Sequence, residues 1–342
     1  MPEPERPARR AGRPRRPRRR ILVWLMLALV VVLAADRVRT LAAPGPAVGH
    51  WDSAAGMAEY TRAYRAVLAA VPAPTRTHDV PTDMGTVRVL EWRGREPDAT
   101  PVALLPGRSS GAPMWAENLP DWLGSRTVYA LDPIGDAGMS SQRTPLESFD
   151  DQATWIAQAL DGLDVDRVHT VGHSFGGASA AIHALRHPEQ LASVTLLEPV
   201  MVVTGLPAST YFWAVITQLP MPQRLKDRAL AEIGGTTVEE VRARTPMSVM
   251  IDAGSQHHSA ALPMPRTLTD DEWRGLAVPL RADLAGDSAL TGRGDAAARL
   301  RELRPDDEVI DWPGATHSLP MQERARLGPA VAQFWAAHDG TG

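Results

Sequence analysis

The sequence predicts an α/β fold with a mostly parallel central sheet and helices on both faces. Short apolar runs typical of buried strands alternate with helix-like stretches from about residue 80 to the end of the chain. One strand-like run, a tight turn and a helix-like stretch surround the pentapeptide Gly-His-Ser-Phe-Gly at 172–176. About 290 residues follow the first fifty, and 44% of all residues are hydrophobic, which suits one large domain.

The expected elements follow from residue patterning in chain order. Residues 85–92 alternate polar and apolar side chains, as a half-buried strand does. Further strands are expected at the short apolar runs 102–105, 127–132, 167–171, 193–197, 279–285 and 308–312. Helices are expected where apolar residues recur at helical spacing or small residues follow a turn, at 50–70, 113–119, 147–163, 177–181, 295–303 and 321–338.

The first 79 residues differ from the rest of the chain. Residues 1–20 hold nine arginines and two glutamates, whereas residues 21–35 (ILVWLMLALVVVLAA) carry no charge. Fifteen helical residues span about 22 Å, so snorkelling arginines or a thinned bilayer must help them cross the ~30 Å hydrocarbon core. We expect a basic cytoplasmic tail at 1–20, a transmembrane anchor or signal segment at 21–35, and a linker with a lead-in helix at 36–79.

The apolar segment 21–35 has two interpretations, a cleaved signal peptide or a retained signal anchor. No clear A-x-A cleavage site follows it, since Leu33-Ala34-Ala35 is a poor match and Leu41-Ala42-Ala43 precedes Pro44. The sequence therefore favours the anchor, with a single pass through the cell membrane and the catalytic body outside the cytoplasm. Cleavage would instead give a secreted protein.

Charge and composition argue against several partners and sites. The whole chain has a net charge of −4, and its first twenty residues contribute +7, so the remainder carries −11. An acidic body argues against nucleic acid as a partner. The absence of cysteine excludes disulfides, thiolate nucleophiles and cysteine-bound metals, and no His-x-x-His or similar set indicates a metal site. No cofactor is implied.

The G-x-S-x-G pentapeptide predicts a nucleophile elbow, with Ser174 as the nucleophile. Such a serine sits at a sharp strand-to-helix turn in a strained backbone conformation, with its hydroxyl clear of the sheet. Gly172 and Gly176 supply the room that this turn requires. The pentapeptide alone also arises by chance, so the prediction depends on partners elsewhere in the chain.

A serine nucleophile needs a base and an acid that orients the base. His317 is the best candidate base, because its loop lies between the last expected strand and the last helix. Two carboxylates compete for the role of the acid. Glu198 closes the strand after the elbow helix, and Asp287 follows the next strand, so both lie at the carboxyl edge of the sheet. Glu198 is preferred on placement alone.

An oxyanion hole requires two backbone N–H groups. Phe175 directly follows the nucleophile and supplies one of them. The loop after the strand at 102–105 supplies the other, most simply from Arg108, since Gly107 lets backbone approach the substrate. The competing interpretation of this loop is an ordinary turn.

These residues resemble the α/β-hydrolase superfamily, in its esterase-like serine hydrolases with a lid insertion, over roughly residues 80–340. The elbow matches at 172–176, and Pro106-Gly107 with Trp115 resembles the usual oxyanion segment. Asp132 to Ser140 resembles the loop D-x-x-G-x-G-x-S, and Gly314 to Pro320 matches the late G-x-x-H-x-x-P loop. The resemblance implies an α/β-hydrolase fold at 80–342, preceded by the N-terminal hydrophobic helix, with a lid at about 200–275 (the lid segment).

The chain departs from the family pattern at two positions. Pro106 replaces the family's common histidine in the oxyanion segment, and Ala289 occupies the position of its usual acid. The acid has therefore moved to Glu198, is replaced by Asp287, or is missing from a degenerate triad. In the lid segment, aromatic residues such as Tyr211 and Phe212 are candidates for an apolar pocket or for the core.

The resulting prediction is a membrane-anchored or exported serine hydrolase that cleaves an ester or related acyl bond of a small-molecule substrate. Ser174, His317 and Glu198 form the expected triad, and Phe175 and Arg108 form the expected oxyanion hole. An acyltransferase or cofactor-free peroxidase would use the same triad. A non-catalytic binding protein would keep the fold without the activity, and an epoxide hydrolase is disfavoured because it requires a carboxylate nucleophile.

Overall fold

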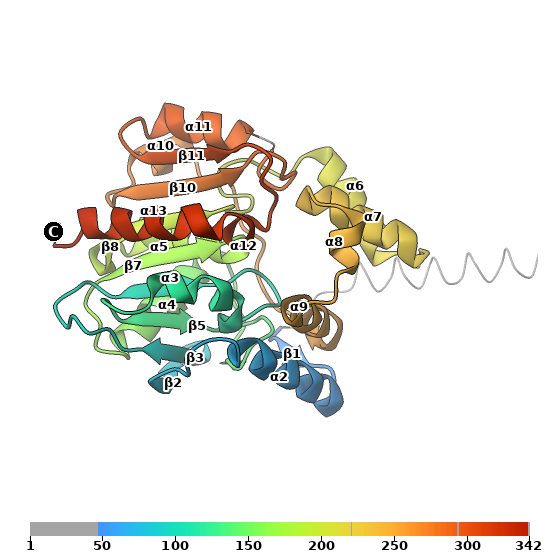
Figure 1. Cartoon of the computed structure of the whole chain (residues 1–342), viewed down its shortest axis with the longest axis horizontal. Helices are drawn as coiled ribbons and strands as arrows, with labels where there is room; N and C mark the ends of the chain where they lie inside the picture. The colour runs from blue at the N-terminus through green and yellow to red at the C-terminus, as the bar shows by residue number, and fades with distance from the viewer. Residues whose placement is uncertain (1–46, 220, 293, 341–342) are drawn as a thin grey trace, which may run out of the picture. The chain divides into compact units, whose positions relative to one another are not determined.

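A nine-stranded sheet forms the centre of the described chain (Figure 1). The computed structural model describes residues 47–219, 221–292 and 294–340. The strands of the sheet are β2 (Arg76–Thr82), β3 (Gly85–Trp92), β4 (Val102–Leu105), β5 (Val128–Leu131), β6 (Ser141–Gln142), β7 (Val168–His173), β8 (Leu191–Leu197), β10 (Leu280–Ala285) and β11 (Glu308–Trp312).

The strand order is β11-β10-β8-β7-β4-β5-β3-β2, with β6 paired to β3. The strands from β11 to β5 are parallel to one another, whereas β3 runs antiparallel to both β5 and β2. The prediction of a mostly parallel sheet is therefore confirmed. The edge strand β2 was not expected, because its residues (RTHDVPT) are largely polar and include Pro81, which edge strands tolerate.

Helices cover both faces of the sheet. They are α2 (Ala54–Leu68), α3 (Leu119–Trp122), α4 (Asp151–Asp161), α5 (Phe175–Arg186), α6 (Ala208–Gln218), α7 (Gln223–Gly234), α8 (Val238–Arg242), α9 (Pro246–His257), α10 (Asp270–Arg274), α11 (Asp295–Leu303), α12 (Leu319–Gln322) and α13 (Arg324–Ala337), with the 3₁₀ turns η1 (Ala112–Glu117) and η2 (Pro188–Gln190). The apolar sides of α2–α5, α11 and α13 meet the sheet, because no other surface of comparable size can bury them, whereas α6–α9 lie beyond the sheet edge.

The core has two parts, one on each face of the sheet. Successive residues of β4 point to opposite faces, so Val102 and Leu104 join one apolar cluster and Ala103 and Leu105 join the other. Helices α4, α5 and α11 contribute to one cluster, whereas α2, α3 and α13 contribute to the second. A sheet buried on both faces requires this arrangement, and it explains why the central strands read as continuous apolar runs.

Several expected helices differ from the observed ones at their ends, and the helix expected at 113–119 is instead the 3₁₀ turn η1 followed by α3. The lead-in helix begins at Ala54 rather than at residue 50, because the side chain of Ser53 caps it by accepting from the N–H of Gly56. Just before the cap, His50–Trp51 form the short strand β1, which pairs antiparallel with β9 (His258–Ser259). The expected closing helix is divided into α12 and α13 at Glu323.

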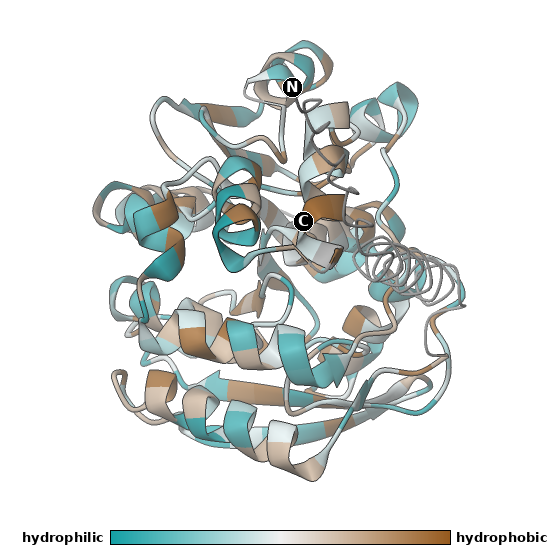
Figure 2. Cartoon of the chain, turned by 90° about the vertical axis from the view of Figure 1, so that its right-hand side faces the viewer, coloured by the Kyte–Doolittle hydropathy of each residue, from teal (hydrophilic) through white to brown (hydrophobic). Residues whose placement is uncertain are grey.

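The lid segment lies between β8 and β10 and contains helices α6–α10 together with the short strand β9. Figure 1 shows α6–α9 on the side of the sheet where the parallel strand β8 ends. Figure 2 faces this side and shows hydrophobic residues among hydrophilic ones on the helices. The role of this segment as a lid stays a prediction.

The predicted tail at 1–20 and apolar segment at 21–35 lie outside the described residues. None of the described helices has the length and apolar character that crossing a bilayer requires.

Candidate active site

Ser174 lies at the turn between β7 and α5, and its backbone has φ 56° and ψ −118°. A positive φ is costly for a residue with a side chain, so the surrounding backbone must hold this turn in place. A Cβ atom on Gly172 would lie 2.2 Å from the carbonyl oxygen of Gly176, and one on Gly176 would lie 2.2 Å from that of Leu105. Only glycine fits at either position, which is the close packing that the pentapeptide predicts.

The imidazole of His317 lies directly beside the serine hydroxyl. Its Nε2 atom is 2.9 Å from Oγ of Ser174, although 143 residues separate the two positions. His317 belongs to the loop after β11, and the backbone N–H of His317 donates to the carbonyl oxygen of Gly234 at the end of α7. The lid segment therefore contributes directly to the position of this histidine.

Glu198 is fully buried at the end of β8, and its carboxylate contacts His317 from the side opposite to Ser174. Its Oε2 atom lies 3.2 Å from Nδ1 of His317. The other oxygen accepts the N–H of Ala285 at 2.5 Å and the hydroxyl of Thr291 at 3.0 Å. Both oxygens are thus engaged, which fixes the carboxylate and offsets the cost of burying it.

These contacts determine which nitrogen of His317 carries the proton. An ionised carboxylate can only accept, so the Nδ1–H of His317 donates to Glu198. The Nε2 atom then has a free lone pair and accepts the hydroxyl proton of Ser174. This tautomer is the one that can remove a proton from the serine.

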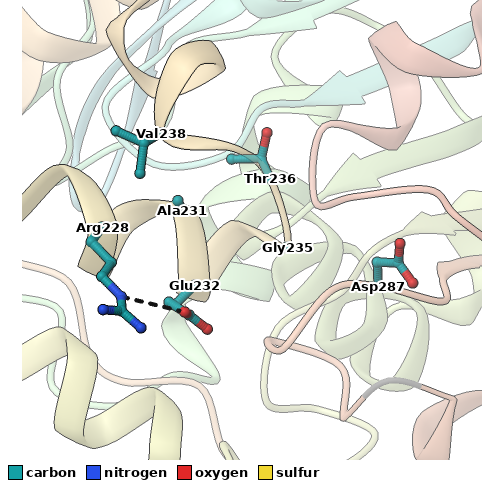
Figure 3. A pocket seen from close by; sticks show the side chains of 7 residues that line it. All are labelled: Arg228, Ala231, Glu232, Gly235, Thr236, Val238 and Asp287. Carbon is teal, nitrogen blue, oxygen red and sulfur yellow. Dashed lines mark ion pairs between the residues drawn. The ribbon is translucent and has the colours of Figure 1, made fainter.

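Asp287, the other candidate acid, faces a separate pocket. This pocket has a volume of about 490 Å³ and is lined by Arg228, Ala231, Glu232, Gly235, Thr236, Val238 and Asp287 (Figure 3). Arg228 and Glu232 form an ion pair of 3.7 Å on α7, and Asp287 comes from the loop after β10. The carboxylate that binds His317 is that of Glu198.

The two residues expected to form the oxyanion hole belong to segments that flank Ser174. Phe175 is the first residue of α5, so its N–H has no partner within the helix. A Cβ atom on Gly107 would lie 3.3 Å from Cβ of Ser174, which brings the backbone next to Arg108 against the elbow. The guanidinium of Arg108 lies 5.9 Å from the centre of the Phe175 ring.

Two buried carboxylates that the sequence did not assign to the site hold this oxyanion loop. Asp132 accepts the N–H groups of Ala112 at 2.5 Å and Met139 at 2.6 Å. Asp136 accepts the N–H of Ser109 at 2.9 Å, at a residue whose φ is 60°. The bonds to Asp132 and Asp136 restrain the backbone that follows β4, including the strained residue Ser109. Oxyanion donors need such a preorganised backbone.

The lead-in helix α2 supports the same carboxylates. The hydroxyl of Tyr64 donates to Asp132 at 3.2 Å, and that of Tyr60 donates to the carbonyl oxygen of Ala137 at 3.4 Å. Burial raises the pKa of Asp132 to about 6, although its hydrogen bonds oppose the change. Burial, followed by the charge of Asp132, raises the pKa of Tyr64 far above its ordinary value. Both groups are hydrogen-bonded and withdrawn from solvent.

The side chain of His173, which precedes Ser174, also contacts His317. Its Nε2–H donates to the carbonyl oxygen of His317 at 2.9 Å, so it fixes the backbone of the catalytic-base candidate. Burial, and then the nearby His317, lower the pKa of His173 to about 3, which keeps it neutral. The sequence placed His173 only in the elbow. Within the described residues, no three acidic or histidine side chains are grouped as a set of metal ligands.

Comparison with known proteins agrees with this geometry. The sequence profile of the alpha/beta hydrolase fold matches residues 100–232, which include the oxyanion loop, the elbow and Glu198. The chain belongs to the α/β-hydrolase superfamily.

Two relatives cover most of this superfamily member. An uncharacterised carboxylesterase designated nap, from Bacillus subtilis, is 27% identical over 290 residues, which are 82% of this chain and 93% of the relative. Carboxylesterase YbfK of Bacillus subtilis is 26% identical over 284 residues, which are 80% of this chain and 93% of the relative. The crystal structure of naproxen esterase from Bacillus subtilis has a TM-score of 0.73 at 24% identity, covering 83% of this chain and 99% of that one. The predicted fold, superfamily and carboxylesterase-like enzyme class are confirmed.

The packing at the elbow predicts a large effect of one methyl group. We expect Gly172→Ala to lower the free energy of unfolding by about 3 kcal/mol, because its Cβ would collide with backbone that cannot move. Gly205→Ala is the control, since a Cβ there meets nothing within 4 Å, and it should change stability by less than about 0.5 kcal/mol. Denaturant unfolding measures both values, and equal stabilities would contradict the packing.

The raised pKa of Asp132 predicts a pH-dependent cost. The pKa of Asp132 is about 6 in the folded protein and 3.8 in the unfolded chain, so the folded protein binds the proton more tightly. The free energy of unfolding that this proton contributes is therefore full below pH 4 and is lost as the pH rises through 6. The stability of the natural protein relative to Asp132→Asn should therefore fall by about 3 kcal/mol between pH 4 and pH 7. Unfolding curves at both pH values test this, with the exposed Asp98→Asn as control; a constant difference between Asp132→Asn and the natural protein would contradict it.

Proposed function

We propose that the protein hydrolyses carboxylic esters with Ser174 as nucleophile, His317 as general base and acid, and Glu198 as the residue that orients His317. The observation that carries this proposal is the unbroken hydrogen-bonded series Glu198–His317–Ser174. Its members come from three loops at one edge of the sheet, and each lies within hydrogen-bond reach of the next. No structural need of the fold explains such an alignment of a buried carboxylate, an imidazole and a strained serine.

In the first half of the reaction, Oγ of Ser174 attacks the carbonyl carbon while its proton moves to Nε2 of His317. Negative charge develops on the former carbonyl oxygen, which we expect the N–H groups of Phe175 and Arg108 to bind. Glu198 stabilises the imidazolium that forms, since its carboxylate accepts the Nδ1–H throughout. The intermediate collapses, the alcohol leaves with the proton from His317, and an acyl-serine remains.

In the second half, a water molecule takes the place of the serine hydroxyl. His317 removes a proton from the water, the hydroxide attacks the acyl carbon, and the second intermediate expels Ser174 with that proton restored. The products are a carboxylic acid and an enzyme in its starting state. The reaction needs no group beyond the side chains and backbone already named.

The relatives support an ester as the substrate. Those covering most of the chain are named carboxylesterases, and naproxen esterase has the same fold. We infer a small-molecule ester whose acyl carbonyl reaches Ser174 between the oxyanion loop and the lid segment.

The roles of the two carboxylates can be separated by kinetics. Glu198→Gln should lower kcat for an activated ester by about 10²- to 10⁴-fold, because a glutamine no longer enforces the required tautomer and charge. Asp287→Asn should leave kcat within about twofold, because Asp287 contacts none of the reacting groups. Ser174→Ala should lower kcat by at least ~10³-fold. A greater loss in Asp287→Asn than in Glu198→Gln would contradict the assignment.

We also propose that residues 21–35 anchor the protein in the cell membrane, with the catalytic body outside the cytoplasm. The uncharged run of fifteen residues follows an arginine-rich segment, which is the charge distribution of an N-in anchor. The lack of a clear cleavage site after this run supports retention over secretion.

The anchor predicts the location and the N-terminus of the mature protein. We expect the protein to sediment with membranes, to resist extraction by salt and alkaline carbonate, and to keep its residues 1–35. N-terminal sequencing of the purified protein measures the last point. A mature chain that begins near residue 36 or 44 would contradict retention, and a salt-soluble full-length chain would contradict the anchor.

A further inference from the structure

Helix α6 exposes an apolar face. Tyr211, Phe212 and Val215 have exposed fractions of 51%, 58% and 53%. Val215 lies four residues after Tyr211 and three after Phe212, and side chains at these spacings are neighbours on a helix surface. The eleven residues of α6 carry no charge. Single apolar residues are common on protein surfaces, but several together on an uncharged helix mark a surface that contacts something else. The sequence suggested a pocket or core position for Tyr211 and Phe212, and the structure places them at the surface.

The opposite side of α6 packs against α7, so the exposed face is held at a fixed angle. Trp213 lies within 5.6 Å of the Arg228 guanidinium of α7. Residues 205–256 carry five basic and five acidic side chains, which gives them no net charge, whereas the chain after residue 20 as a whole carries −11. Net charge therefore does not oppose the approach of this segment to an anionic bilayer.

The chain enters the body beside the same segment. Strand β1 pairs with β9, which directly follows α9 of the lid segment. Eleven residues, 36–46, separate the end of the expected anchor from the first described residue, and they reach at most about 40 Å when fully extended. An anchor at 21–35 therefore allows β1, and the lid segment with which it pairs, to reach the bilayer.

We propose that α6 docks on the lipid bilayer, with Tyr211, Phe212 and Val215 inserted among the headgroups and upper acyl chains. This proposal rests on the anchored location proposed above. An uncharged apolar helix face next to aromatic residues suits the interface between water and lipid. Because the end of α7 binds the backbone of His317, docking brings the reactive serine and its base next to the bilayer. The substrates it favours are apolar esters dissolved in the membrane.

The absence of cysteine makes a direct test possible. Phe212→Cys, labelled with the polarity-sensitive fluorophore NBD, reports the surroundings of α6 in the full-length protein reconstituted into phosphatidylcholine–phosphatidylglycerol vesicles. The matched control is Glu189→Cys, labelled in the same way. Glu189 is exposed and lies just before the start of β8, whereas α6 follows the end of β8, and the length of this strand separates its two ends by about 20 Å. Ester hydrolysis by both labelled proteins verifies that they are folded.

Docking predicts a blue-shifted emission from position 212 in vesicles, quenched by lipids with brominated acyl chains, and an unshifted, unquenched emission from position 189. If the protein floats with the vesicles but position 212 reports water, docking is wrong and the anchor stands. If the protein does not float, the anchor fails and docking fails with it. A blue shift that appears in detergent without vesicles and grows with protein concentration assigns the face to a second copy of the chain, and overturns the proposal.

Discussion

The buried carboxylate of Glu198 is the group on which the rest of the site depends. A carboxylate that is removed from water is costly unless its oxygens find strong partners, and here they bind a backbone N–H, a hydroxyl and the imidazole of His317. The N–H comes from Ala285 at the end of β10, the hydroxyl from Thr291 in the loop after β10, and the imidazole from the loop after β11. One side chain thus links the ends of β8 and β10 to the loops after β10 and β11, and it binds the imidazole of His317 at the same time.

The sheet provides the distances that this link requires. Strand β8, which ends at Glu198, lies between β7, which leads to Ser174, and β10. A second set of buried polar groups fixes the other side of the site, where Asp132 and Asp136 hold the oxyanion loop and Tyr64 of α2 donates to Asp132. Ser174 therefore lies between two sets of buried, hydrogen-bonded polar groups.

Local signals made the elbow and the central strands predictable. Gly172, Ser174 and Gly176 are close in sequence, and apolar runs bounded by turns identify strands without knowledge of their neighbours. His317 and Glu198 were expected near Ser174 because both follow strands of the same parallel sheet. Other long-range partners were not predictable. Tyr64 meets Asp132 across 68 residues and His173 meets the carbonyl of His317 across 144, and neither contact leaves a periodic or compositional trace. The polar edge strand β2 was missed because its pairing with β3, rather than its own residues, makes it a strand.

The central claim is that His317, held by Glu198, activates one particular serine. The most direct measurement is peptide mapping by mass spectrometry after the folded, full-length protein reacts with a fluorophosphonate, which modifies only activated serines. The account predicts a single adduct on the peptide that contains Ser174, at one equivalent per chain. A folded protein that stays unmodified, or an adduct on a different serine, would contradict it.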